Sequence, residues 1–123
     1  MSTQPAEPPT IPQPPVNAEA IRAALAQIAP HRLPEFDQDR AATIARARAE
    51  VSAAPLQAFT QSWAIEVAVA RHPRTAARLS DLEDRSAQVA DLNTARAIAA
   101  EIARIRNDAA TEAGIRTAAG EAR

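Results

Sequence analysis

The stretch from Pro55 to His72, PLQAFTQSWAIEVAVARH, constrains the fold more than any other part of the chain. It contains the single Trp, Trp63, and one of the two Phe residues, Phe59. Its apolar residues recur at the three- and four-residue spacing that places side chains on one face of an α-helix. The main face comprises Leu56, Phe59, Trp63, Val67 and Ala70, and the opposite face comprises Ala58, Ile65 and Val69. A helix that is apolar on two sides is normally buried between partners, so we expect this one at the centre of a small helical domain.

Two further helices are expected before the central one. Asn17 can accept a hydrogen bond from the backbone as the N-cap of a first helix over residues 18–29, and Pro30 ends this helix. Pro34 suits the first turn of a second helix over about residues 34–53, because the N–H that proline lacks has no partner there.

Two more helices are expected after it. Pro73 opens a fourth helix that reaches about Leu92, and Asp91 or Asn93 can cap a fifth helix that reaches about Ala110. The apolar stripe changes phase near Leu92, which favours a break over one continuous helix.

Arg40 has the least expected position of the second helix, because it falls in the middle of the apolar face. That face comprises Leu33, Phe36, Ile44, Ala47 and Val51. A buried Arg needs a carboxylate partner, for which Glu66 of the central helix is the candidate. Alternatively, the guanidinium reaches solvent while its methylene stem packs against apolar neighbours, or it forms a site for an anion.

Both ends of the chain are expected to lie outside the folded domain, which we place at residues 17–110. Residues 1–16 contain six of the ten prolines and almost no anchoring apolar residue, which predicts a disordered, partly polyproline-II tail. Its proline spacing also fits a PxxP ligand, although basic flanking residues are missing. Residues 111–123 lack large apolar residues apart from Ile115 and contain both glycines, which predicts a flexible, frayed C-terminus.

The composition favours a folded domain with a thin core. Leu, Ile, Val and Phe together number 22 of the 123 residues, near the level at which chains become disordered, yet the net charge is only −1. Few large side chains must therefore balance the entropy lost on folding. A protein partner or a second copy of the chain would bury more apolar surface, so we expect the protein to work with one or the other.

The sequence shows no arrangement typical of a catalytic or cofactor site. It contains no Cys, which excludes thiolate nucleophiles and Cys-based zinc sites, and its two Gly residues form no phosphate-binding loop. His31 and His72 lie in separate predicted connections, and we interpret them as solvated. The carboxylates Glu35 and Asp37, with Asp39 beyond them, suit the first turns of a helix. We therefore expect no enzymatic activity, no cofactor, no metal and no small-molecule substrate.

No apolar run is long enough to span a membrane, and the N-terminus lacks the pattern of a signal peptide. A cytoplasmic protein without membrane association is the expectation.

Two groups of residues are candidates for partner binding. Arg71, Arg74 and Arg78 form a basic cluster that is either a solvated surface, a site for an acidic protein or a site for nucleic acid. Ile98 and Ile102, with Ile105 one turn further, form a narrow ridge bordered by charged residues. Such a ridge either docks in a partner's groove or closes the core of its own domain.

Several short segments resemble a known family. They are AEAIRAAL at residues 18–25, LPEFD at 33–37, the APL segment and Trp-bearing helix at 54–63, and HP at 72–73. In this order they resemble small actinobacterial proteins of unknown function that are sometimes encoded near toxin–antitoxin genes. The chain departs from the family at Arg40, where the pattern has a bulky aromatic residue. The resemblance implies a helical, non-enzymatic accessory role, with antitoxin-like binding of a partner as one option.

The sequence therefore predicts an all-α protein, a small bundle of four or five helices with loose ends. The leading functional hypothesis is a protein-interaction module, antitoxin-like in one form of it. The alternative is a nucleic-acid-binding regulator that uses the region from Arg71 to Arg78.

Overall fold

The computed structural model describes residues 8–115, and the expectations for residues 1–7 and 116–123 lie outside this range. The described part is all-α, as predicted, and contains no strand. Its elements in chain order are α1 (Ala18–Ile28), the 3₁₀ turn η1 (Pro30–Arg32), α2 (Leu33–Glu50), α3 (Ala54–Ala70), α4 (Pro73–Ser86) and α5 (Leu92–Glu112).

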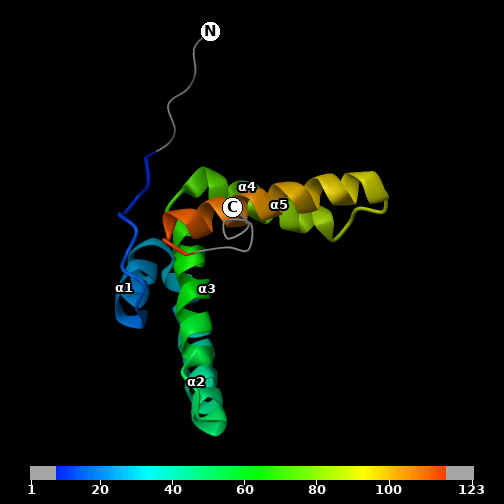
Figure 1. Ribbon diagram of the computed structural model, residues 1–123. Helices are drawn as coiled ribbons and strands as arrows, with labels where there is room; N and C mark the ends of the chain where they lie inside the picture. Colours follow the sequence, from blue (N-terminus) through cyan, green and yellow to red (C-terminus); the bar gives the residue numbers. More distant parts are fainter. Residues whose placement is uncertain (1–7, 116–123) are drawn as a thin grey trace.

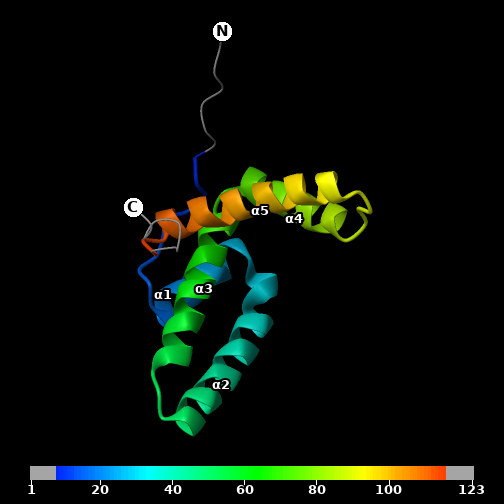
Figure 2. The same cartoon turned by 45° about the vertical axis from the view of Figure 1, so that its right-hand side comes forward.

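The helices form two hairpins that meet at an angle, so the molecule has the outline of a letter L (Figures 1 and 2). We call the α2–α3 hairpin the leg and the α4–α5 hairpin the arm. Helix α3 contacts α1, α2, α4 and α5, whereas α2 contacts neither helix of the arm within the described residues. As predicted, α3 is the central helix.

The helix starts follow the local chemistry of the sequence. The side chain of Asn17 accepts a hydrogen bond from the backbone N–H of Ala20 at 2.8 Å, and the Asp91 carboxylate accepts one from Thr94 at the same distance. Helices α2, α3 and α4 each have proline in the first turn. The prediction of these five helices and their starting regions is therefore confirmed.

Two helix ends differ from the prediction. Helix α4 ends at Ser86, well before Leu92, and residues 87–91 form the connection to α5, for which Asp91 is the N-cap. Leu92 then begins α5 with 61% of its surface exposed. Helix α5 continues to Glu112.

The core gathers around three aromatic rings. Phe36 of α2 lies 5.1 Å from Phe59 and 5.2 Å from Trp63, measured between ring centroids. Aromatic pairs favour the tilted and edge-to-face arrangements that these rings adopt. Ile21 and Leu25 of α1 are fully or almost fully buried beside them.

Three apolar residues expected in the core are exposed instead. Leu56 and Ala58 lie in the first turns of α3, toward the far end of the leg and away from the arm. Val51 is 91% exposed because it occupies the left-handed turn that ends α2. The buried side of α2 includes Thr43 in addition to Phe36.

The partner expected for Arg40 is also different. Arg40 pairs with Glu19 of α1 at 2.7 Å and keeps about a third of its side chain exposed, so its guanidinium lies at the rim of the core. Glu66 instead faces Arg32 of η1, with 3.7 Å between the charged atoms. The 3₁₀ turn therefore places Arg32, and not Arg40, beside Glu66.

The folded part extends beyond residues 17–110 at both ends. At the N-terminus, Pro8–Val16 forms no helix, but it lies along α3 and is hydrogen-bonded to it at three residues: Thr10, Ile11 and Gln13. At the C-terminus, Ala113 is buried and Ile115 packs against the core. Contacts with the core therefore continue beyond residues 17 and 110 among the described residues.

Candidate functional site

The inner corner of the L contains a cleft of about 500 Å³, which we call the corner cleft. Its walls come from the end of α1, from η1, from the last turns of α3, and from both helices of the arm. The lining residues are Ile28, Ala29, His31, Arg32, Glu66, Val69, Ala70, Ala76, Leu79, Ser80, Glu83 and Arg106.

The floor of the corner cleft is apolar. Val69 and Ala70 come from α3, and Ala76 and Leu79 come from α4. These residues meet because Pro73 starts a new helix directly after α3, which turns the chain from the leg into the arm. Val69 and Leu79 are each 5% exposed, so they belong to the core and to the cleft at once.

The rim of the corner cleft carries charges of both signs. Arg32 bridges two carboxylates, Glu35 at 3.2 Å and Glu66 at 3.7 Å. On the arm side, Glu83 of α4 pairs with Arg106 of α5 at 3.1 Å. The side chains of Glu83 and Arg106 are about half exposed, and exposed pairs contribute little to stability, so a partner can exchange this pair for one of its own at low cost.

This geometry is suited to binding. An apolar floor of two helices receives apolar side chains, and a rim of balanced charge orients them. Among residues 8–115, no group of three His, Asp or Glu side chains is arranged to hold a metal ion.

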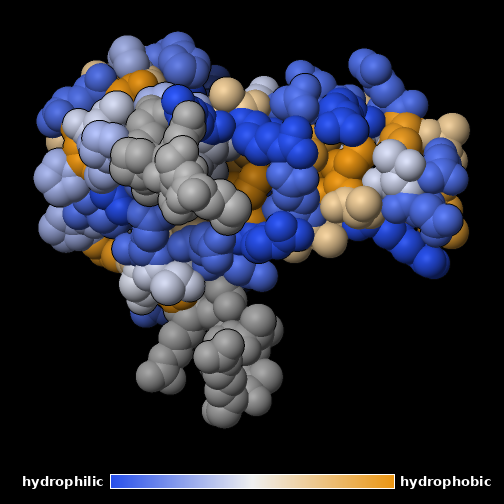
Figure 3. Space-filling view, turned by 90° about the horizontal axis from the view of Figure 1, so that it is seen from above, coloured by the Kyte–Doolittle hydropathy of each residue, from blue (hydrophilic) through white to orange (hydrophobic). Residues whose placement is uncertain are grey.

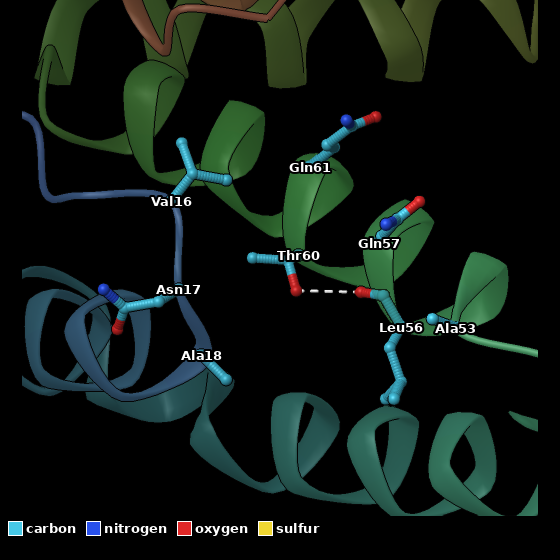
Figure 4. Close-up of a pocket in the computed structure, with 8 residues that line it drawn as sticks. All are labelled: Val16, Asn17, Ala18, Ala53, Leu56, Gln57, Thr60 and Gln61. Carbon is cyan, nitrogen blue, oxygen red and sulfur yellow. Dashed lines mark hydrogen bonds between the residues drawn. The ribbon is translucent and has the colours of Figure 1, made fainter.

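A second, smaller groove of about 350 Å³ lies on the leg, between the start of α1 and the first half of α3 (Figure 4). Val16 and Leu56, which are 44% and 37% exposed, contribute apolar surface to it. The Thr60 hydroxyl donates a hydrogen bond to the Leu56 carbonyl at 2.8 Å, so its O–H group already has an acceptor within the helix. No charged residue lines this groove.

The isoleucine ridge of Ile98, Ile102 and Ile105 packs within its own domain. Ile98 is 5% exposed, and Ile102 and Ile105 pack against the hydrophobic core. From the two alternatives for this ridge, the structure shows closure of the domain's own core. Seen from above, apolar surface along the arm is broken up by hydrophilic side chains (Figure 3).

The basic cluster does not form one site. Arg78 donates two hydrogen bonds to Glu101 of α5, at 2.7 and 2.8 Å, and a longer one to Asp81. These bonds raise the pKa of Arg78 and lower that of Glu101. Arg74 is exposed in the first turn of α4.

Arg71 belongs to a joint between the ends of three helices. It pairs with Glu112, which also contacts the His72 ring nitrogen Nε2 at 2.8 Å. Burial would raise the pKa of Glu112, but the hydrogen bonds and charges of His72 and Arg71 outweigh it, and this pKa lies below its ordinary value. Arg71 and Arg78 thus connect helices within the molecule.

The remaining candidates from the sequence also have structural partners. The carboxylates of α2 each accept hydrogen bonds from a different residue: Glu35 from Arg32, Asp37 from Arg22, and Asp39 from Trp63. The two His residues lie in different places: His72 contacts Glu112, and the exposed His31 lines the corner cleft.

Sequence reasoning missed the corner cleft. Its residues come from five elements, and those of α3 and α4 read as ordinary members of apolar stripes. The one available signal was Pro73, which fixes a sharp corner at this point, but proline position alone does not give the angle between helices.

Comparisons with protein-family models, with curated proteins and with solved structures find no match to this chain. Among the described residues, no helix is both long enough and apolar enough to cross a lipid bilayer.

Proposed function

We propose that this protein is a non-enzymatic, cytoplasmic protein-interaction module that holds a segment of its partner in the corner cleft. The observation that carries the proposal is an apolar floor with a rim of charged pairs, placed where the two hairpins meet. The floor would bury apolar side chains of the partner, while Arg32 and Glu83 would orient its charged groups.

An antitoxin-like role is one specific form of this proposal. It requires the partner to be a toxin whose activity is blocked when the corner cleft is filled. A toxin-like reading frame beside the gene for this chain would support it.

Nucleic-acid binding through the region from Arg71 to Arg78 is less well supported. Phosphate contacts need guanidinium groups that can face the ligand. Arg71 and Arg78 direct their donors to Glu112 and Glu101 instead, so binding phosphate would require breaking contacts that join helices.

The corner cleft can be tested by filling it. Ser80 is exposed and lines the cleft, so Ser80→Trp should block a partner without disturbing the core. Ser62→Trp is the matched control, because Ser62 is an exposed serine of α3 that lines none of the clefts described above. We expect tagged wild-type and Ser62→Trp proteins to retain the same partner from cell extract, and Ser80→Trp to lose it while melting at the same temperature.

Equal retention by both variants would contradict the assignment of the corner cleft. Sedimentation of the purified chain shows whether the occupant of the corner cleft is a second copy of the chain or a different protein. A dimer that dissociates on Ser80→Trp would identify the chain itself as the occupant.

A further inference from the structure

Residues 8–16, PPTIPQPPV, form a non-helical strap along α3. The strap contacts Ala64 and Arg71, whereas the corner cleft uses Glu66 and Val69. These pairs are two residues apart along a helix, so the strap and the corner cleft lie on roughly opposite faces of α3. In Figures 1 and 2 the blue strap passes the C-terminal end of α5 on its way to α1.

The upper part of the strap caps the end of α3. Thr10 donates its backbone N–H to the carbonyl of Arg71 at 2.8 Å and its hydroxyl to the same oxygen at 3.2 Å. The last carbonyls of a helix have no partner within the helix, so they are ready acceptors for an extended chain. Thr10 uses one of them.

The Arg71 guanidinium forms the second contact. Its side chain is 11% exposed and donates to the Ile11 carbonyl at 3.2 Å, while Glu112 holds its other terminal nitrogen. Ile11 packs its side chain against the core. A fixed cation is thus directed at a backbone carbonyl of the strap.

Gln13 forms the third contact, donating from its side-chain Nε2 to the Ala64 carbonyl at 3.1 Å. The strap therefore makes recognition contacts at positions 10, 11 and 13, with Pro12 between the last two and prolines on either side of the set. Proline-rich chains adopt the extended polyproline-II form without a partner, so they lose little entropy when they bind.

The fit of the strap is incomplete. Arg71 Nε and Gln13 Oε1 are both buried in this contact and have no hydrogen-bond partner in the described structure. Buried polar atoms that lack partners cost free energy, which weakens the hold of α3 on its own strap.

We infer that this face of α3, with Arg71 and the Ala64 carbonyl at its two ends, is a docking surface for extended proline-rich peptides. The strap is its internal occupant. A partner segment with a Thr or Ser at the position of Thr10 and an amide donor three residues later displaces the strap. The inference is independent of the corner cleft and of its proposed function.

Binding of the partner segment has to compete with the strap, which is covalently attached and so has a high effective concentration. Weakening the strap in the full-length chain should therefore reveal the site. We choose Gln13→Ala alone and Thr10→Pro with Gln13→Ala, because these changes remove the N–H, the hydroxyl and the amide donor. Gln88→Ala is the matched control, since Gln88 is exposed in the connection between α4 and α5, at the tip of the arm and away from the strap.

The probe is a fluorescein-labelled peptide of sequence PPTIPQPPV, and its binding is measured by fluorescence anisotropy. We expect the double variant to bind it at least about tenfold more tightly than wild type, because the apparent affinity scales with the fraction of open sites. Gln13→Ala should fall between them, and Gln88→Ala should match wild type. A peptide with alanine in place of both the Thr and the Gln should bind the double variant at least about tenfold more weakly.

Absence of saturable binding to either strap variant, at peptide concentrations up to about 1 mM, would overturn the inference. So would equal affinity for wild type and both strap variants. A second measurement uses the unmodified chain: excess peptide should accelerate hydrogen exchange at the Thr10 amide and leave the α2 amides unchanged. Exchange at Thr10 that does not respond would also count against the site.

Discussion

Trp63 is held by three different kinds of interaction. Its ring packs edge-on against Phe36, its indole N–H donates to Asp39 at 2.7 Å, and the Arg32 guanidinium lies 4.8 Å above it. Trp63→Ala would remove all three and leave a cavity, so we expect a loss of about 3–5 kcal/mol in the free energy of unfolding. Urea unfolding followed by circular dichroism measures it. A loss below about 1 kcal/mol would mean that Trp63 does not belong to the core.

The indole–carboxylate bond can be measured separately. Asp39→Ala leaves the indole N–H of the buried Trp63 without its partner, and Trp63→Phe removes the donor itself. A double-mutant cycle with these two changes should give a coupling of about 1 kcal/mol, more if the carboxylate contributes its full charge. Asp84→Ala, at an exposed position of α4, is the control and should change stability by less than about 0.5 kcal/mol. Coupling near zero would show that water replaces Asp39 without cost.

The position of a single residue was predictable where the apolar pattern determines its burial, and unpredictable where a turn determines its partner. Phe59 and Trp63 follow from helical spacing, because one face of α3 has to be buried. The partner of Glu66 does not follow from helical spacing, because η1 places Arg32 beside it. No pattern in the sequence signals a single 3₁₀ turn.

At the level of elements, α2 and α5 end in the same way with different residues. Just past each helix, a backbone N–H bonds to a carbonyl five positions back: Ser52 to Ala47 at 3.0 Å, and Ile115 to Ala110 at 2.9 Å. This Schellman motif places the preceding residue in the left-handed region. That residue is Gly114 in α5 and Val51 in α2.

Val51→Gly should therefore stabilise the protein. Valine adopts a φ of 51° only with steric cost, and its side chain is 91% exposed, so little packing is lost on its removal. We expect a gain of up to about 1 kcal/mol, reduced by the greater freedom of glycine in the unfolded chain. Thermal unfolding measures it, and Val51→Asn should give a smaller gain in the same direction. A loss of stability would mean that Val51 makes contacts that offset its strain.

Gly114→Ala is the converse change. A Cβ at this position would meet no atom within 4 Å, so the only penalty is the backbone φ of 76°. We expect a loss of about 1 kcal/mol, measured by the same thermal unfolding. An unchanged or higher melting temperature would show that the end of α5 tolerates another backbone conformation.

The elements were largely predictable because their starts are encoded locally. Asn17 and Asp91 act as N-caps, and three prolines occupy first turns, so five helices could be placed from the sequence. The ends were harder. Val51 has none of the glycine character that usually marks a helix end, and α4 ends at Ser86 with no glycine or proline in residues 86–90 to mark the position.

The arrangement of the whole molecule could not be predicted. The apolar faces of α3, α4 and α5 fit a compact bundle as well as two hairpins at an angle, since helix packing permits several crossing angles. The strap was missed for a related reason. Its contacts use the backbone of Thr10 and Ile11 and the polar end of Gln13, none of which appears in a hydrophobic pattern.

The joint at Glu112 predicts how the whole molecule responds to acid. Its carboxylate contacts Arg71 at the end of α3 and His72 before α4, and Arg71 in turn holds the strap. Because the pKa of Glu112 is lowered in the folded state, its ionised form stabilises the fold. This contribution is complete above the unfolded pKa of about 4.3 and is lost as the pH falls through the lower folded value.

Glu112→Gln separates this joint from the other carboxylates. The pKa values of Glu19, Asp37 and Glu101 are also lowered, each chiefly by a hydrogen bond from an Arg, so acid should destabilise the variant too. We expect Glu112→Gln to be less stable than wild type near pH 7, and the gap to narrow below about pH 4 as protonated Glu112 becomes neutral like Gln. Urea unfolding over this range measures the gap, with Glu50→Gln at the far end of the leg as the control. A gap that stays constant with pH would mean that Glu112 supports the joint through packing and not through its charge.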